Sequence, residues 1–122
     1  MEWLWVILAG FLAVDAAMLL RAAFVPAEDA RRLLADGAMI VDVRTGREFR
    51  RGHLPRTLNI PLGDLREQIL LRVPDKNQSI LVHCQSGGRS EIARRRLKKM
   101  GYVNVRNLGS LARARRIVSP HA

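Results

Sequence analysis

The sequence has little cysteine and few aromatic residues. Its 122 residues contain a single cysteine, Cys84, so no internal disulfide can form and a disulfide-stapled secreted protein is excluded. A zinc site is not expected, because the histidine nearest to Cys84 is its neighbour His83 and no second cysteine is present. Aromatic residues make up 5% of the chain but hydrophobic residues 48%, so we expect an aliphatic core. The length suits one small domain, in which Cys84 is a free thiol, a buried filler or a nucleophile.

Charge is nearly absent from residues 3–20. This segment contains one charged residue, Asp15, and as a helix its 18 residues would span about 27 Å, close to the hydrocarbon thickness of a bilayer. A cleaved signal peptide should open with positive charge and close with an A-x-A site, and neither is present. We therefore predict a retained transmembrane anchor over residues 1–24, in preference to a signal peptide or a buried core helix.

Basic residues flank this segment on one side only. Arg21, Arg31 and Arg32 follow it, whereas no Lys or Arg precedes it. The positive-inside rule then predicts a single-pass membrane protein whose residues from 21 onward lie on the cytoplasmic side. That compartment would keep Cys84 reduced.

The rest of the chain alternates between helical and strand patterns. Residues 26–37 begin with Pro26 and acidic residues and end at Gly37, as a helix does. Short apolar runs, typical of buried parallel strands, follow such helical segments. The predicted helices are 26–37, 63–72 and 90–100, and the predicted strands are 39–43, 79–83 and 102–106. This alternation predicts an α/β domain with a mainly parallel sheet, which we place at residues 25–122.

Cys84 directly follows the predicted strand 79–83, at the edge where open parallel sheets bind ligands. Gly87 and Gly88 allow a tight loop whose amides can surround an anion. Arg89 and the N-terminus of the next helix both add positive charge. These effects favour a thiolate over a thiol. We therefore predict that Cys84 is a nucleophile rather than a small buried hydrophobic residue.

A series of short motifs runs from residue 26 to about 112. They are Val41-Asp42-Val43-Arg44, Glu48-Phe49, Gly52-His53-Leu54-Pro55, Asn59-Ile60-Pro61, the loop from His83 to Ser90, Leu97 with Gly101 to Val105, and Asn107-Leu108-Gly109. Together and in this order they resemble the rhodanese-like sulfurtransferases of the single-domain type. The resemblance implies a rhodanese-like three-layer α/β domain, with a five-stranded parallel sheet and helices on both faces.

The resemblance also implies a two-step reaction. Cys84 would take the outer sulfur of a small anionic donor such as thiosulfate, carry it as a persulfide, and pass it to a thiol or to cyanide. The loop amides would stabilise the charge of the persulfide, so no metal and no cofactor is expected. Rhodanese-fold phosphatases have five residues between their cysteine and arginine, whereas Cys84 and Arg89 are separated by four, which disfavours a phosphatase.

The match also assigns roles to individual residues. Cys84 and Arg89 are expected to be catalytic. The expected substrate-binding residues are Gln85, Ser86, Gly87, Gly88 and Arg44, and the expected supporting residues are Asp42, Glu48 and His53. For Asp42 and Arg44 the alternative is a structural ion pair, and for His53 it is a structural histidine.

The sequence departs from the family pattern near its C-terminal end. Ala114 stands where relatives carry a Trp that packs the last helix on the sheet. We therefore expect the segment from Leu111 to be loosely held.

Positive charge is concentrated in residues 89–116, which contain ten Lys or Arg and one acidic residue, Glu91. Such a face could contact anionic lipid headgroups, steer anionic donors, or simply be solvated. Nucleic-acid binding is not expected, because no recognised module or aromatic platform accompanies the charge. The competing function is a non-catalytic, membrane-tethered binding module for a sulfur-relay partner, although the complete Cys84 loop argues against it.

Overall fold

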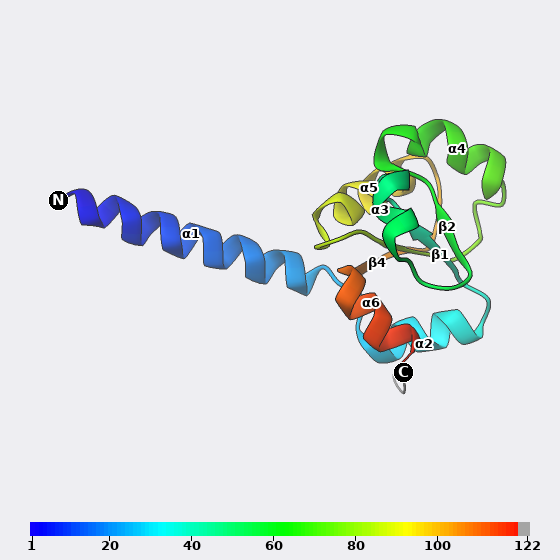
Figure 1. Ribbon diagram of the computed structural model, residues 1–122, viewed down its shortest axis with the longest axis horizontal. Helices are drawn as coiled ribbons and strands as arrows, with labels where there is room; N and C mark the ends of the chain where they lie inside the picture. The colour runs from blue at the N-terminus through cyan, green and yellow to red at the C-terminus, as the bar shows by residue number, and fades with distance from the viewer. Residues whose placement is uncertain (120–122) are drawn as a thin grey trace.

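The computed structural model describes residues 1–119, apart from the side chains of residues 17 and 20–22, as a long helix that leads into an α/β domain (Figure 1). The helices are α1 (Glu2–Ala22), α2 (Ala27–Ala35), α3 (Gly46–Arg51), α4 (Leu65–Arg72), α5 (Gly88–Lys99) and α6 (Leu111–Val118), with one 3-10 turn, η1 (Leu62–Asp64). The strands are β1 (Met39–Asp42), β2 (Thr57–Asn59), β3 (Ile80–His83) and β4 (Val105–Gly109). The end of the predicted domain, residues 120–122, lies outside this description.

The strands form a parallel sheet in the order β2-β1-β3-β4. The predicted α/β class and parallel sheet are confirmed, but the five-stranded sheet is not, because the sheet has four strands within residues 1–119. Among the described residues, one parallel bridge, between Phe24 and Asn107, lies at the outer edge of β4, and next to it the Val25 N–H donates to the Asn107 carbonyl oxygen at 2.8 Å. Pro26, which has no N–H to donate, and α2 (Ala27–Ala35) follow at once, so the pairing along this edge ends there.

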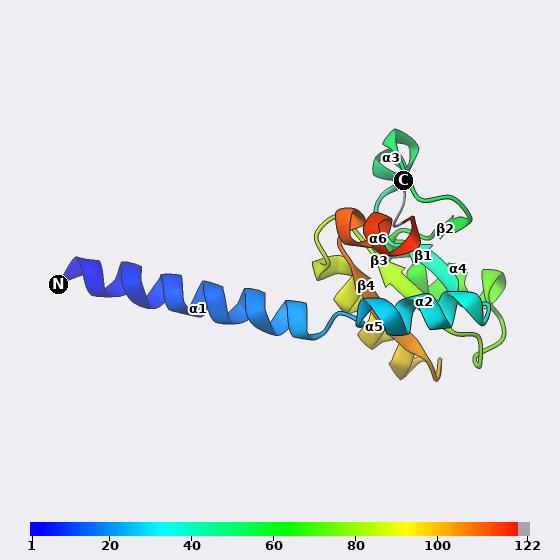
Figure 2. The ribbon, with the colours of Figure 1, turned by 90° about the horizontal axis from the view of Figure 1, so that it is seen from below.

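Each face of the sheet has its own hydrophobic core, because successive strand residues point to opposite sides. The core shared with α4 and α5 contains Val41, Val82, Val105, Leu65, Ile69, Ala93 and Leu97. The core shared with α2 and α6 contains Ile40, Leu81, Leu108, Ala30, Ala114 and Ile117. Figures 1 and 2 show α2 and α6 side by side on one face of the sheet. The domain is therefore a three-layer sandwich whose strands all end at the same edge.

The C-terminal helix α6 is firmly packed, so the expectation of a loosely held segment is wrong for Leu111–Val118; residues 120–122 lie outside the described residues. Leu111, Ala114 and Ile117 are buried on one side of this helix. The Ser110 hydroxyl oxygen accepts a hydrogen bond from the Arg113 N–H at 3.1 Å and caps the helix. The small Ala114 lets α6 approach the sheet closely, so burial of these three residues replaces the anchoring that a Trp would supply.

The helix α1 projects away from the domain (Figures 1 and 2). Large apolar side chains along it are exposed, among them Trp5, Phe11 and Leu12. Over the part of the chain that the structure describes, no helix is long and apolar enough to qualify as a membrane span, so the anchor predicted for residues 1–24 is not supported. The predicted anchor includes residues 17 and 20–22, whose side chains lie outside the description.

Candidate active site at Cys84

Cys84 lies immediately after β3, at the edge where the parallel strands end, and only 1% of it is exposed. Its backbone N–H donates to the carbonyl oxygen of Gly109 at 3.2 Å. Its Sγ accepts hydrogen bonds from the Gly87 N–H at 3.0 Å and from the Ser90 hydroxyl at 3.4 Å. The sulfur is therefore held by polar donors, and it does not face apolar side chains alone.

The loop that surrounds the sulfur takes its shape from Gly87. This residue has a φ of +102° and directly precedes α5, whose Glu91 N–H donates to the Gly87 carbonyl oxygen at 3.2 Å. A left-handed φ of this kind favours glycine, because a side chain would clash with the backbone. The loop is also fastened to the start of α6: the Leu111 N–H donates to the Gln85 carbonyl oxygen at 3.3 Å, and Ser86 bridges to Ser110.

Burial and hydrogen bonding act in opposite directions on the thiol. Burial, the largest single influence, raises the pKa of Cys84, since it disfavours the charged form. The Ser90 hydroxyl and the N–H groups of Ser90, Gly87 and Ser86 lower the pKa, and together they outweigh the burial. The pKa of Cys84 therefore lies below its ordinary value, and the sulfur is predisposed to be a thiolate.

Ser90 is the residue of this site to which the sequence analysis assigned no role. It is fully buried in the first turn of α5, and its hydroxyl lies 3.4 Å from Sγ and 3.0 Å from the Gly87 carbonyl oxygen. The one signal in the sequence is a hydroxyl side chain in the first turn of the helix that follows the nucleophile. That signal is weak, because serine is also common near helix N-termini for capping alone.

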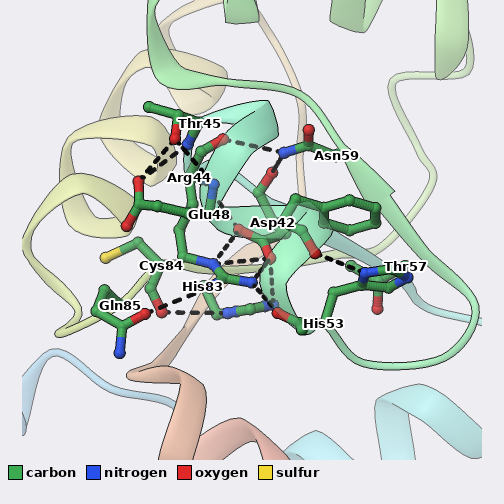
Figure 3. A network of polar contacts seen from close by, with 12 residues as sticks. Asp42, Arg44, Thr45, Glu48, His53, Thr57, Asn59, His83, Cys84 and Gln85 are labelled. Atoms are coloured by element: carbon green, nitrogen blue, oxygen red, sulfur yellow. Dashed lines mark hydrogen bonds and ion pairs between the residues drawn. The ribbon is translucent and has the colours of Figure 1, made fainter.

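Asp42 and Arg44 form a buried ion pair beside the cysteine loop (Figure 3). The Arg44 Nε lies 3.0 Å from both Asp42 carboxylate oxygens. Its Nη1 donates to Gln85 Oε1 at 3.3 Å and its Nη2 donates to the Gly52 carbonyl oxygen at 2.8 Å. The guanidinium thus connects the end of β1, the loop after α3 and the residue that follows Cys84. This is the geometry of the structural ion pair, the alternative considered for these two residues.

Arg89 points to Glu48 and makes no hydrogen bond to the sulfur among the described contacts. Its Nη1 and Nη2 donate to the two carboxylate oxygens of Glu48 at 2.7 and 2.9 Å. Arg89 is the main reason that the pKa of Glu48 falls from 4.5 to about 2. Glu48 also accepts from the Thr45 N–H at 3.1 Å and forms a capping box with Thr45 at the start of α3. The pair therefore ties α3 to the beginning of α5.

The two histidines near the site occupy different environments. His53 stacks on Phe49, with ring centroids 3.7 Å apart, and its Nδ1 lies 2.7 Å from the Phe49 carbonyl oxygen. His83 is fully buried, with Nδ1 3.3 Å from the Cys84 carbonyl oxygen and Nε2 3.6 Å from Asp42 Oδ2. Burial lowers the pKa of His83, which favours the neutral ring. Neither imidazole makes a hydrogen bond to Sγ in the part of the chain that the structure describes.

A cleft of about 370 Å³ opens next to the loop. Its lining residues are Arg44, Glu48, Arg51, Gly52, Gln85, Leu111 and Arg115. Three of these side chains are arginines and one is acidic, so the cleft favours a small anion. Within the described residues, no group of three or more His, Cys, Asp or Glu side chains could hold a metal ion.

Known proteins resemble this chain over most of its α/β domain. Residues 26–112 match the family model of the rhodanese-like domain. The thiosulfate sulfurtransferase PspE of Escherichia coli (strain K12) is 39% identical over 71 residues, which cover 58% of this chain and 68% of that protein. Thiosulfate sulfurtransferase 18 of Arabidopsis thaliana is 40% identical over 97 residues, which cover 70% of this chain and 71% of the relative.

Two solved structures also resemble this chain. A structure described as a rhodanese with anions from E. coli is 36% identical and superposes with a TM-score of 0.61, covering 63% of this chain and 91% of that one. The human single-domain sulfurtransferase TSTD1 is 31% identical, with a TM-score of 0.59 and coverage of 70% and 87%. Both similarities extend over most of the compared protein.

Proposed function

The chain belongs to the rhodanese-like domain family, and on this premise we propose that it is a sulfurtransferase of the thiosulfate type. The observation that carries the proposal is the environment of Cys84: a buried sulfur that accepts hydrogen bonds from Gly87 and Ser90, with a pKa below its ordinary value. Two relatives with about two fifths of their aligned residues identical are named thiosulfate sulfurtransferases. A non-catalytic binding module would not need a sulfur that is kept ready to ionise.

The proposed reaction has two displacement steps. In the first, the Cys84 thiolate attacks the outer sulfur of thiosulfate; a bond from Sγ to that sulfur forms, the sulfur–sulfur bond of the donor breaks, and sulfite leaves with the electron pair. In the second, cyanide or a thiolate attacks the terminal sulfur of the persulfide, the bond to Sγ breaks, and the Cys84 thiolate is restored. Thiocyanate or a new persulfide is released. Each step is balanced without an added oxidant or reductant.

The proposed roles of the surrounding residues follow from their contacts. The N–H groups of Ser86, Gly87 and Gly88 are expected to surround the terminal sulfur of the persulfide, where its charge resides. Gln85, held by Arg44 at 3.3 Å, and the arginine-lined cleft are expected to receive the anionic donor. Arg89 is expected to act through its charge and through its hold on Glu48, because its guanidinium already donates to that carboxylate.

The intact mass of the protein tests this function. After exposure to thiosulfate, the chain should gain the mass of one sulfur atom, and a reducing thiol should remove it. The matched Cys84→Ser variant should gain nothing, and it should not convert thiosulfate and cyanide to sulfite and thiocyanate. A wild-type chain that gains no sulfur would instead favour the non-catalytic module, and hydrolysis of a phosphate ester would favour a phosphatase.

The location of the chain remains a proposal from the sequence. We infer a single-pass membrane anchor over residues 3–20, with the domain on the cytoplasmic side. The exposed apolar side chains of α1 support this anchor. The finding that no described helix is long and apolar enough to span a membrane does not support it. The exposed basic residues Arg95, Lys98 and Lys99 of α5 are proposed to contact anionic headgroups. Resistance to alkaline carbonate extraction and protease protection in sealed vesicles test the anchor and its orientation. Release by carbonate would contradict the anchor.

A further inference from the structure

Phe24, in the short connection between α1 and α2, lies against the cysteine loop. A Cβ atom placed on Gly87 would come within 2.5 Å of the Phe24 Cζ, and one placed on Gly109 would come within 3.0 Å of its Cδ2. Both glycines have left-handed φ angles, +102° and +96°. The ring therefore occupies the space that side chains on these two glycines would need.

The two glycines contact Cys84 through their backbone. Gly87 donates its N–H to Sγ at 3.0 Å, and Gly109 accepts the N–H of Cys84 at 3.2 Å. Glycine has the widest backbone freedom of all residues, so two glycines next to a nucleophile need an external constraint if their peptide groups are to stay aligned. The Phe24 ring covers both.

Phe24 is itself held in place. Its backbone forms the parallel bridge to Asn107, and the Asn107 side chain donates to the Gly87 carbonyl oxygen at 3.2 Å and accepts the Gly109 N–H at 2.9 Å. The guanidinium of Arg113 lies over the ring, 5.3 Å from its centroid, within the range of a cation–π contact. The ring is thus packed between the glycines and the start of α6.

We propose that Phe24 is a positioning residue of the site, whose ring fixes the loop so that the Gly87 N–H points at the Cys84 sulfur. The effect on sulfur transfer rests on the function proposed above, whereas the effect on the thiolate does not. Without the ring, a cavity forms above two flexible residues, and the loop samples conformations in which this N–H no longer reaches the sulfur. The thiolate then loses a donor.

The test uses the full chain with Phe24→Ala and Phe24→Leu, and with Phe11→Ala as a matched control on the exposed surface of α1. The rate at which iodoacetamide alkylates Cys84, the single cysteine, is measured against pH. We expect the midpoint of the Phe24→Ala profile to rise by about 0.5 to 1 pH unit, since one donor to the thiolate is weakened. Persulfide formation from thiosulfate should slow by about three- to tenfold at pH values well below the midpoint, which matches 0.5 to 1 unit of pKa. For both the alkylation midpoint and the rate of persulfide formation, Phe24→Leu should lie between wild type and Phe24→Ala, and Phe11→Ala should match wild type.

The possible outcomes distinguish a role of Phe24 in positioning the cysteine loop from a role in the stability of the fold alone. An unchanged alkylation midpoint in Phe24→Ala, even with a lower melting temperature, overturns the proposal, because a purely structural ring would change only stability. If Phe24→Ala does not fold, the profile of Phe24→Leu decides, since leucine retains much of the packing. A wild-type chain that forms no persulfide would refute the proposed function alone, because the alkylation profile reports on the thiolate without any sulfur transfer.

Discussion

At the scale of single residues, the chemistry of the site depends on how many donors reach one sulfur atom. Burial works against ionisation of Cys84, and several hydrogen bonds work for it. Displacement of a donor should therefore make the sulfur less ready to ionise, because each donor favours the thiolate. The reactivity of Cys84 is a property of its loop and of the residues packed against that loop.

Removing the Ser90 hydroxyl should make Cys84 less acidic. Ser90→Ala deletes a donor 3.4 Å from Sγ, so the pH midpoint of alkylation should rise by about 0.5 to 1 unit, and at pH values well below the midpoint the rate should fall about three- to tenfold. The sign follows from the lowered pKa: the donor favours the thiolate, so its loss requires a higher pH for the same ionised fraction. Stopped-flow alkylation across pH 5 to 10 measures this.

A control for this variant is Ser79→Ala. Ser79 precedes β3 whereas Cys84 follows it, and the Ser79 hydroxyl accepts a hydrogen bond from the Asn104 side chain at 2.8 Å. Its midpoint should match wild type. The Ser90 hydroxyl also lies 3.0 Å from the Gly87 carbonyl oxygen, and a single proton can serve one acceptor at a time. An unmoved midpoint in Ser90→Ala would mean that the proton stays on that carbonyl and does not reach the sulfur.

The sequence predicted the nucleophile but not all of its partners. Cys84 could be identified because a strand end, paired glycines and an arginine coincide within a few positions. The direction in which the Arg89 guanidinium points could not be predicted, because its partner Glu48 lies 41 positions away in the chain. Phe24 gave no signal at all, because its contact with Gly87 and Gly109 exists only after β4 and the α1–α2 connection have come together.

At the scale of helices and strands, local patterns placed the buried strands well and the sheet edges poorly. The predicted strands 39–43 and 79–83 overlap β1 and β3, whose residues are nearly all buried. The predicted strand 102–106 starts too early, because β4 begins only at Val105. Tyr102 precedes the strand, with its side chain buried and its hydroxyl donating to the Val73 carbonyl oxygen at 2.6 Å. Edge pairing is set by tertiary contacts, so the strand number that the resemblance implied is not found: the described residues form a sheet of four strands.

The ion pair between α3 and α5 should stabilise the domain in a pH-dependent way. Glu48→Gln retains the ability to cap α3 at Thr45 but loses the charge that faces Arg89, so it should reduce the free energy of unfolding by about 1 kcal/mol at pH 7. Because the pKa of Glu48 drops from 4.5 to about 2 on folding, the difference from wild type should be fully present above pH 4.5 and decline toward pH 2. Urea denaturation at several pH values measures it.

A matched control for the ion pair is Glu67→Gln, which removes an exposed carboxylate from α4. Its unfolding free energy should differ little from wild type at any pH. If the deficit of Glu48→Gln instead stayed constant from pH 7 down to pH 3, the loss would come from packing or capping, and the charge of Glu48 would not be its cause.

At the scale of the whole molecule, the chain separates into a projecting helix and a domain that carries the chemistry (Figure 1). The family match begins at residue 26, after α1, and both hydrophobic cores are made of residues from Val25 onward. Phe24, in the connection that follows α1, lies against Gly87 of the cysteine loop. The residues that the cysteine site needs should therefore begin within the connection between α1 and α2.

Two shortened chains that begin on either side of Phe24 can locate this boundary. A chain that begins at Ala23 keeps the ring, both cores and the bridge to Asn107, so it should melt within a few degrees of the full chain and show the same alkylation midpoint for Cys84. A chain that begins at Val25 should still fold, because the core residues remain, but its midpoint should rise as in Phe24→Ala, since the two glycines lose their cover. Thermal melts by circular dichroism and the pH profile of alkylation measure both. A raised midpoint already in the chain that begins at Ala23 would show that α1 itself contributes to the site, and identical midpoints in the two shortened chains would show that the ring does not.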